Sequence, residues 1–277
     1  MKVTWVIENI NKESSYLELA AAVKKLNYPL IEVNGDYKKE ILKDLNLYYT
    51  PADCRCVIFN GSIEMAKLVR ADLGNHCQPV IYSNFEKYKC SAYYSYFGRY
   101  LFNDKYCLMS LSELGRQRYS VYGQYGKEAL IFCRPDSGEK TFQAQLLDII
   151  DLDRFLEQRD DIKHELVLVS TPKNIKWEGR FICSKYKEII AYSTYRFQGQ
   201  ISKIPSVPPE TIKFCQEILD NNNYWPDSVF CLDLCQDNDN VTWLLELTSF
   251  SSAGLYSSNK ENIVKRVSEI AWEDFNK

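Results

Sequence analysis

Short apolar segments alternate with amphipathic segments along the first hundred residues, and this alternation restricts the fold more than any other feature. Residues 3–8, 29–33 and 54–62 are apolar runs of strand length. Residues 14–27 and 63–73 instead carry apolar side chains three and four positions apart, which indicates helices with one buried face. Strands that alternate with helices are typical of a parallel sheet covered by helices. We therefore predict a small α/β layer in this part of the chain.

The pattern changes after residue 128 to strands that follow one another more closely. The expected strands are residues 129–135, 165–172, 228–235 and 241–250, with a hairpin over 179–196 that turns at KYKE. The expected helices are 109–117, 210–222 and 259–275, and residues 204–210 form a proline-stiffened crossover. This mixture predicts an α+β unit. A linker is expected near 103–128, which divides the chain into domains at 1–102 and 103–277.

Composition and charge disfavour two classes of protein. A net charge of −3 provides no general basic field for nucleic acid. No run of about 18 apolar residues occurs, so we expect no membrane span. The N-terminus becomes polar within its first ten residues and does not resemble a signal peptide.

The chain contains ten cysteines, several of them inside apolar runs such as CRCVIF and VFCLDLC. Buried thiols behave there as small hydrophobic side chains, and we expect a reducing, cytoplasmic location. A zinc site is one interpretation of four residues: Cys54, Cys56, His76 and Cys77. Their spacing is not CxxC, so buried thiols are the favoured interpretation.

Residues 82–126 are rich in tyrosine and phenylalanine. One interpretation is a platform on which the bases of single-stranded nucleic acid stack. The favoured interpretation is that these side chains pack, half-buried, between layers of the fold.

The segment IFCRPDSGEKTF places cations around a tight turn. A strand ends at Arg134, the polar turn passes through Ser137 and Gly138, and Lys140 follows. Backbone amides and two cations around one concavity suit a polyphosphate. The Walker sequence GxxxxGK[ST] is absent, so this is a different kind of phosphate turn.

Carboxylates stand on two strands near the C-terminus. Asp233 lies in CLDL, while Glu246 and Thr248 are two residues apart in the next strand and so share a face. Carboxylates among apolar neighbours are costly to bury unless a cation neutralises them, and magnesium is such a cation. The alternative is that one of the two carboxylates points to solvent.

Further charges bracket the hairpin over 179–196. Glu178 and Arg180 are two residues apart and share a face, and Arg196 ends the returning strand. Arginines at strand ends are often surface charges. Together with the carboxylates downstream, they form a set suited to a metal-bound triphosphate.

The order of these segments resembles the ATP-grasp superfamily. The matching stretches are RPDSGEKTF, ELVLVS, WEGRFI, AYSTYR, LDL and LLELTSFSSAGLY. Within the superfamily, the chain is most similar to the phage and bacterial clade named for its two arginines and one lysine. The resemblance covers roughly residues 100–275. It implies an N-terminal preATP-grasp-like α/β domain, followed by an ATP-grasp fold that holds the nucleotide between two α+β subdomains.

The resemblance also implies roles for individual residues. Arg134 stands where the family has a strand-end lysine that contacts the α-phosphate and adenine, and Lys140 matches the lysine of the clade. Ser137 and Gly138 belong to the phosphate turn, and Glu178 joins the nucleotide-binding residues. The backbone of 166–169, including Val167 and Val169, would contact the edge of adenine.

The remaining roles concern phosphate transfer. Arg180 and Arg196 match basic positions near the γ-phosphate and the acylphosphate. Asp233 and Glu246 match the magnesium carboxylates. Thr248 stands where the family commonly has asparagine, a departure that keeps a neutral oxygen but weakens one metal contact.

The activity implied by the resemblance is ATP- and Mg2+-dependent ligation of a carboxylate to an amine, with ADP as a product. The substrates would be small molecules or peptides, and residues 251–259 would form part of their pocket. His76 and His164 lie in no motif, and no general base is evident. Alternatives are a non-catalytic nucleotide-binding protein or, less favoured, a single-stranded nucleic-acid binder. A homodimer is compatible with such a fold.

Overall fold

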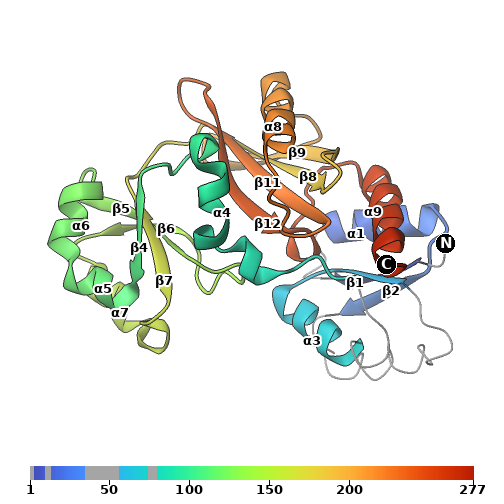
Figure 1. Ribbon diagram of the computed structural model, residues 1–277, viewed down its shortest axis with the longest axis horizontal. Coiled ribbons are helices and arrows are strands. Elements are labelled where there is room, and N and C mark those ends of the chain that lie inside the picture. Colours follow the sequence, from blue (N-terminus) through green and yellow to red (C-terminus); the bar gives the residue numbers. More distant parts are fainter. Residues whose placement is uncertain (1–2, 10–13, 35–55, 74–79) are drawn as a thin grey trace. The chain divides into compact units, whose positions relative to one another are not determined.

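The computed structural model describes residues 3–9, 14–34, 56–73 and 80–277 (Figure 1). Its strands are β1 (Val3–Asn9), β2 (Leu30–Asn34), β3 (Cys56–Asn60), β4 (Tyr106–Ser110), β5 (Leu130–Pro135), β6 (Gln145–Asp148), β7 (Leu166–Ser170), β8 (Trp177–Ser184), β9 (Ile189–Phe197), β10 (Gln200–Ile204), β11 (Val229–Gln236) and β12 (Thr242–Ser249). Its α-helices are α1 (Ser14–Lys25), α3 (Ile63–Leu73), α4 (Cys90–Phe97), α5 (Leu111–Arg116), α6 (Arg118–Tyr125), α7 (Leu152–Glu157), α8 (Pro209–Asn221) and α9 (Lys260–Phe275). Short 3₁₀ helices are η3 (Phe85–Tyr88), η4 (Gly98–Tyr100), η5 (Asp160–Ile162) and η6 (Phe250–Ser252).

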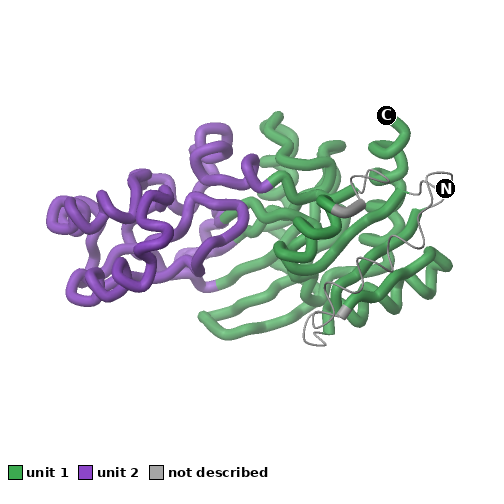
Figure 2. The backbone as a smooth tube through the Cα atoms, turned by 90° about the horizontal axis from the view of Figure 1, so that it is seen from below, with its two compact units in different colours: residues 1–84, 177–234, 246–277 green, residues 85–176, 235–245 purple. Residues whose placement is uncertain are grey.

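The chain forms two compact units, each built from segments that are distant in sequence (Figure 2). Unit 1 comprises residues 1–84, 177–234 and 246–277, and unit 2 comprises 85–176 and 235–245. The domain boundary expected at 102/103 stays a prediction, since the units are defined by compactness. The linker expected near 103–128 is wrong, because β4, α5 and α6 form there.

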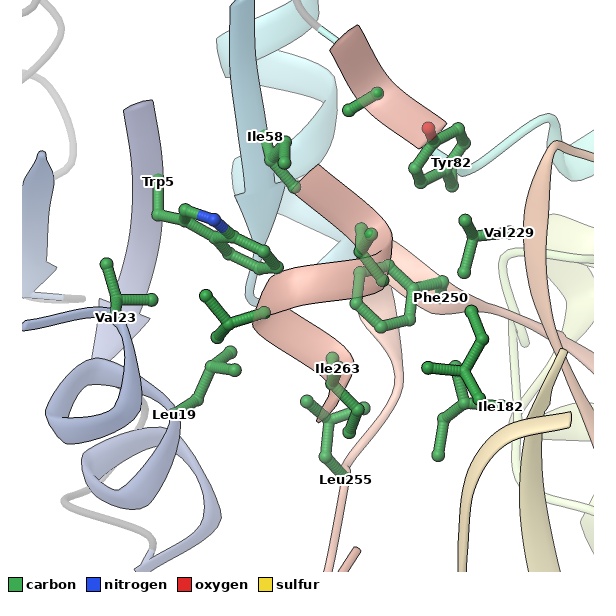
Figure 3. Close-up of a cluster of buried hydrophobic side chains, with 14 of the residues drawn as sticks. Trp5, Leu19, Val23, Ile58, Tyr82, Ile182, Val229, Phe250, Leu255 and Ile263 are labelled. Atoms are coloured by element: carbon green, nitrogen blue, oxygen red, sulfur yellow. The ribbon is translucent and has the colours of Figure 1, made fainter. Parts of the chain in front are cut away.

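Unit 1 contains a three-stranded parallel sheet in the order β2-β1-β3, as the N-terminal alternation predicts. Side chains alternate across β1, so its two faces enter two different cores. Trp5 packs with Leu19 of α1 and Ile263 of α9 on one face (Figure 3). Val6 packs with Met65 of α3 on the other face. Helices therefore cover both faces, which is why β1 is buried along nearly its whole length.

The boundaries of the helices follow local chemistry. Helix α1 ends at Lys25, and Asn27 adopts a left-handed φ of 57° just before Pro29. The helix expected at 109–117 begins later, because Ser110 is its N-cap and accepts a 3.2 Å hydrogen bond from the amide of Glu113. The residues before it form β4, an element that the sequence analysis did not predict.

The second sheet has the order β10-β9-β8-β11-β12. Strands β8 and β9 are antiparallel and form the predicted hairpin. Its register shifts by one residue, because Glu178 pairs with Arg196 while Gly179 pairs with Thr194. Tyr195 is therefore the extra residue of a β-bulge, a feature that redirects a side chain.

Unit 2 is organised around a four-stranded sheet in the order β4-β7-β5-β6. Its core joins Ile131 and Val167 from the strands to Leu114 and Leu152 from the helices. The guanidinium of Arg159 lies 4.0 Å from the centroid of the Phe155 ring and covers the edge of this core.

The aromatic segment is mainly packing. Tyr93, Tyr94 and Phe97 of α4 are buried, with the rings of Tyr93 and Tyr94 5.1 Å apart in an edge-to-face arrangement. Tyr96 and Tyr119 are exposed, but they are single side chains. The packing interpretation of this segment is confirmed, and a base-stacking platform is not supported.

The described cysteines are thiols and not disulfides: Cys56, Cys90, Cys107, Cys133, Cys183, Cys215, Cys231 and Cys235. Cys107 is half-buried and the others are buried, as expected for small apolar side chains. The zinc set weighed above lies mostly outside the described residues, as Cys54, His76 and Cys77 do. No helix in the described part of the chain has both the length and the apolar character needed to cross a membrane.

Candidate active site

A buried ion pair forms the centre of the site in unit 1. Arg180 on β8 donates from Nε to Oδ1 of Asp233 at 2.8 Å and from Nη2 to Oδ2 at 2.6 Å. Arg180 is 5% exposed and Asp233 on β11 is fully buried. The two-point geometry fixes the plane of the guanidinium and directs it along the sheet face.

Three further groups surround the Arg180 guanidinium. Its Nη1 donates to the carbonyl oxygen of Gly254 at 2.9 Å. The rings of Tyr195 and Tyr256 stack 4.9 Å apart, and the Tyr256 centroid lies 5.1 Å from Cζ of Arg180. Burial acts to lower the pKa of Arg180, but the Asp233 carboxylate outweighs it and holds that pKa well above its usual value. Arg180 is therefore a permanent cation in a fixed orientation.

Glu246 and Thr248 of β12 extend this cluster. The Thr248 hydroxyl oxygen lies 3.5 Å from Oδ2 of Asp233 and 3.4 Å from Oε1 of Glu246. Glu246 is half-buried. The shared face predicted for Glu246 and Thr248, with Asp233 beside them, is therefore present. The alternative in which one carboxylate turns to solvent does not apply to Asp233.

These oxygens fit part of a magnesium coordination sphere. Neighbouring ligands of octahedral magnesium are about 2.9 Å apart, so spacings of 3.4 and 3.5 Å need only a small adjustment. Among the described residues, no group of three or more histidine, cysteine, aspartate or glutamate side chains is placed to hold a metal ion. In proteins, magnesium is usually bound by one or two carboxylates plus substrate phosphates.

Glu178 is a buried acidic residue on β8 of the same sheet. Its Oε2 accepts a 2.8 Å hydrogen bond from the Tyr195 hydroxyl, and Arg196 lies 3.5 Å from its Oε1. Burial raises the pKa of Glu178, with smaller upward contributions from Asp233 and Glu246, and these together outweigh Tyr195 and Arg196. Arg196 itself is exposed, unlike Arg180.

In unit 2, Arg134 is buried near the end of β5. The backbone of the turn that follows forms hydrogen bonds with other residues of unit 2. The amide of Asp136 donates to the Leu166 carbonyl, the amide of Glu139 to the Ser137 hydroxyl, and the amide of Lys140 to the Ser137 carbonyl. These three amides are already engaged. That this turn contacts phosphate through Ser137 and Gly138 stays a prediction.

A cavity of about 410 Å³ adjoins this turn. Its lining residues are Phe85, Glu86, Lys89, Ser91, Asp136, Ser137, Gly138, Glu139, Thr141, Glu165 and Leu166. Four of these are acidic, which disfavours a triphosphate within the cavity itself. Lys140 is exposed, with a left-handed φ of 52°. Its contact with phosphate stays a prediction.

Strand β7 occupies the centre of its sheet. It pairs with β4 on one side and with β5 on the other, and Val167 and Val169 are buried in the core of unit 2. The backbone N–H and C=O groups of such a central strand form hydrogen bonds with the two neighbouring strands. The adenine contact proposed for 166–169 stays a prediction.

The sequence analysis missed Tyr195 and Gly254. The bulge in β9 directs Tyr195 into the site, and no pattern of residues in the sequence predicts this bulge. Gly254 contributes a backbone carbonyl, which is independent of side-chain chemistry. The loop 251–259 was assigned to the pocket wall, but its contact with Arg180 was not foreseen.

Comparisons with family models and with curated proteins gave no match. Solved structures are similar over the full length. D-cycloserine synthetase DcsG matches with a TM-score of 0.64 and 8% identity, over 97% of this chain and 99% of that one. D-alanine–D-alanine ligase from Bacillus anthracis, complexed with ATP, matches with a TM-score of 0.59 and 12% identity, over 100% and 99%. The ATP-grasp ligase PsnB, complexed with a minimal precursor, matches with a TM-score of 0.55 and 11% identity, over 99% of each chain.

These similarities extend through both units, and they agree with the order of segments from which the superfamily was expected. The clade named for two arginines and one lysine stays a prediction. The chain has the ATP-grasp fold.

Proposed function

We propose that this protein is an ATP- and magnesium-dependent, ADP-forming carboxylate–amine ligase. The observation that carries the proposal is the cluster of Arg180, Asp233, Thr248 and Glu246 on one sheet of an ATP-grasp fold. It combines a fixed cation with hard oxygen ligands, and phosphoryl transfer depends on such charge neutralisation and positioning.

Glu246, the Thr248 hydroxyl and one oxygen of Asp233 would hold the magnesium. When bound, the ion would neutralise charge on the nucleotide phosphates. Arg180 would contact the γ-phosphate and then the acylphosphate, and exposed Arg196 would approach from the strand end. Arg134, Ser137, Gly138 and Lys140 would contact the nucleotide, as the resemblance implies. In this proposal the chain divides into a preATP-grasp-like domain, 1–102, and an ATP-grasp domain, 103–277.

The reaction would proceed in two steps. An oxygen of the substrate carboxylate attacks the γ-phosphorus, the bond to the β,γ-bridging oxygen breaks, and ADP leaves. The amine nitrogen then attacks the acyl carbon of the acylphosphate, phosphate leaves with the electrons of the C–O bond, and the nitrogen loses a proton. A carboxylate of the site or the substrate itself would accept that proton.

The substrate class is proposed from the residues around the site and from the similar structures. Those structures include an amino-acid ligase and a ligase in complex with a minimal precursor. We propose a small-molecule or peptide carboxylate and an amine, brought together in the cytoplasm, where the described thiols would stay reduced. A homodimer is compatible with this scheme.

The test measures ADP and phosphate release with ATP and magnesium, in the presence of pools of amino acids, polyamines and short peptides. We expect release that depends on a pool and is abolished by Glu246→Gln. Glu269→Gln is a matched control, because Glu269 is an exposed acid paired with Arg266 on α9. Absence of ATP binding would overturn the proposal.

A second candidate is a nucleotide-binding protein without turnover. Two observations favour it: Arg180 engages both oxygens of Asp233, and a threonine stands where a stronger metal ligand is expected. This candidate predicts magnesium-dependent ATP binding and no ADP in any pool.

A further inference from the structure

We propose that Lys260 is a positioning residue that holds the loop of residues 253–259 against Arg180. This inference rests on the proposed function for its catalytic meaning, while its structural content concerns unit 1 alone. The argument starts from the unusual burial of the lysine.

Lys260 is the first residue of α9, and its side chain is 6% exposed. Its Nζ donates to the carbonyl oxygens of Tyr256 and Ser258 and lies 3.2 Å from Oε2 of Glu18 on α1. Burial lowers the pKa of Lys260, so enclosing this ammonium is unfavourable without such partners. A lysine on the first turn of a helix ordinarily extends into water, whereas this one turns back to the preceding loop.

The loop needs such an anchor. Tyr256 has a φ of 43°, a left-handed conformation that costs free energy for a residue with a bulky side chain. Its carbonyl is one of the two that Lys260 binds. The Ser258 hydroxyl also lies 3.1 Å from that of buried Ser193 on β9. These contacts hold the turn where the Tyr256 ring meets the Tyr195 ring.

The same loop supplies two contacts to Arg180. The carbonyl of Gly254 accepts a hydrogen bond from Nη1, and the Tyr256 ring lies beside the guanidinium. Asp233 fixes the other two nitrogens. Lys260 therefore acts on Arg180 through the backbone of the loop, without contacting it.

The alternative is that Lys260 only ties α9 to α1 through Glu18. Glu18→Gln tests this alternative, because it removes the ion pair and leaves both carbonyl contacts in place. The two roles predict different effects on Arg180.

The decisive experiment compares Lys260→Met with Lys185→Met in the full chain. Lys185 is a matched control, since it is partly buried and bonded to Ser228 and Asp274 in unit 1 but contacts no residue of the site. Phenylglyoxal modification of Arg180 is located by peptide mass spectrometry without ATP, and exposed Arg116 serves as the internal reference.

We expect Arg180 to react about tenfold faster in Lys260→Met, because the loop opens more often, and at the wild-type rate in Lys185→Met and Glu18→Gln. If Lys260→Met does not fold, Lys260→Arg replaces it, with a smaller increase expected because the charge is retained. Unchanged protection of Arg180 in the folded variant would overturn the inference.

ADP formation is the second readout. We expect Lys260→Met to lower kcat with a smaller change in the KM for ATP, as expected when a group that acts on the transferred phosphate is misplaced. If no variant or wild type forms ADP, the proposed function fails while the phenylglyoxal result still decides the role of Lys260.

Discussion

Arg180 and Asp233 pair through two short hydrogen bonds between the neighbouring strands β8 and β11, although 53 residues separate them in the sequence. Both are buried. A buried pair of this kind is costly to break, because removing one partner leaves an uncompensated charge in the interior.

Asp233→Asn should therefore destabilise the protein by about 3–5 kcal/mol, measured as the free energy of unfolding in urea. The double variant Arg180→Met/Asp233→Leu should lose less than Asp233→Asn, since no buried charge remains. Arg116→Met, which breaks an exposed pair with Glu113, is the control and should leave the urea midpoint unchanged. Equal effects of Asp233→Asn and Arg116→Met would contradict the buried pair.

Glu178 should make stability depend on pH. Its pKa is raised in the folded protein by burial, so the folded state binds a proton more tightly than the unfolded state does. This contribution to stability is complete below the ordinary glutamate pKa and is lost as the pH rises through the raised value. We expect Glu178→Gln to gain stability relative to wild type as the pH rises across that range. Parallel curves of unfolding free energy against pH would rule out the raised pKa.

Gly138 should not tolerate a side chain. A Cβ there would lie 2.3 Å from the carbonyl oxygen of Phe85, which is backbone and has little room to shift. Gly138→Ala should cost about 1–3 kcal/mol, read from thermal unfolding. Gly123→Ala is the control, because Gly123 lies in α6 with no atom within 4 Å of an added Cβ. It should be neutral or stabilising, and a similar loss in both variants would argue against the close approach at Phe85.

Thr248 should influence the magnesium requirement. Thr248→Val keeps the shape but removes the oxygen beside Asp233 and Glu246, and we expect the magnesium concentration for half-maximal ADP formation to rise about tenfold or more. Thr248→Asn keeps an oxygen and should retain activity. Thr242→Val on the same strand is the control. A magnesium requirement unchanged in Thr248→Val would remove Thr248 from the proposed ligands.

The local pattern of the sequence predicted most regular elements. The parallel sheet of β1, β2 and β3, the β8–β9 hairpin and helix α9 all appeared close to the expected residues, because the periodicity of apolar side chains is a property of neighbouring residues. The spacing of Glu246 and Thr248 likewise required a common face once they lay on a strand. The sequence analysis missed some short elements, whose patterns are brief or mixed: β4, β6, β10, α4, α6 and α7.

The sequence by itself determined most of the segments that become strands and helices, and which charged side chains share a face of one strand. Only the tertiary structure decided which faces meet. Three features depend on contacts between segments. Arg180 pairs with Asp233, a bulge directs Tyr195 into the site, and Lys260 bonds to the loop that precedes it. Strand register and bulges are set by packing against residues distant in the sequence. The periodicity of neighbouring residues therefore does not predict them.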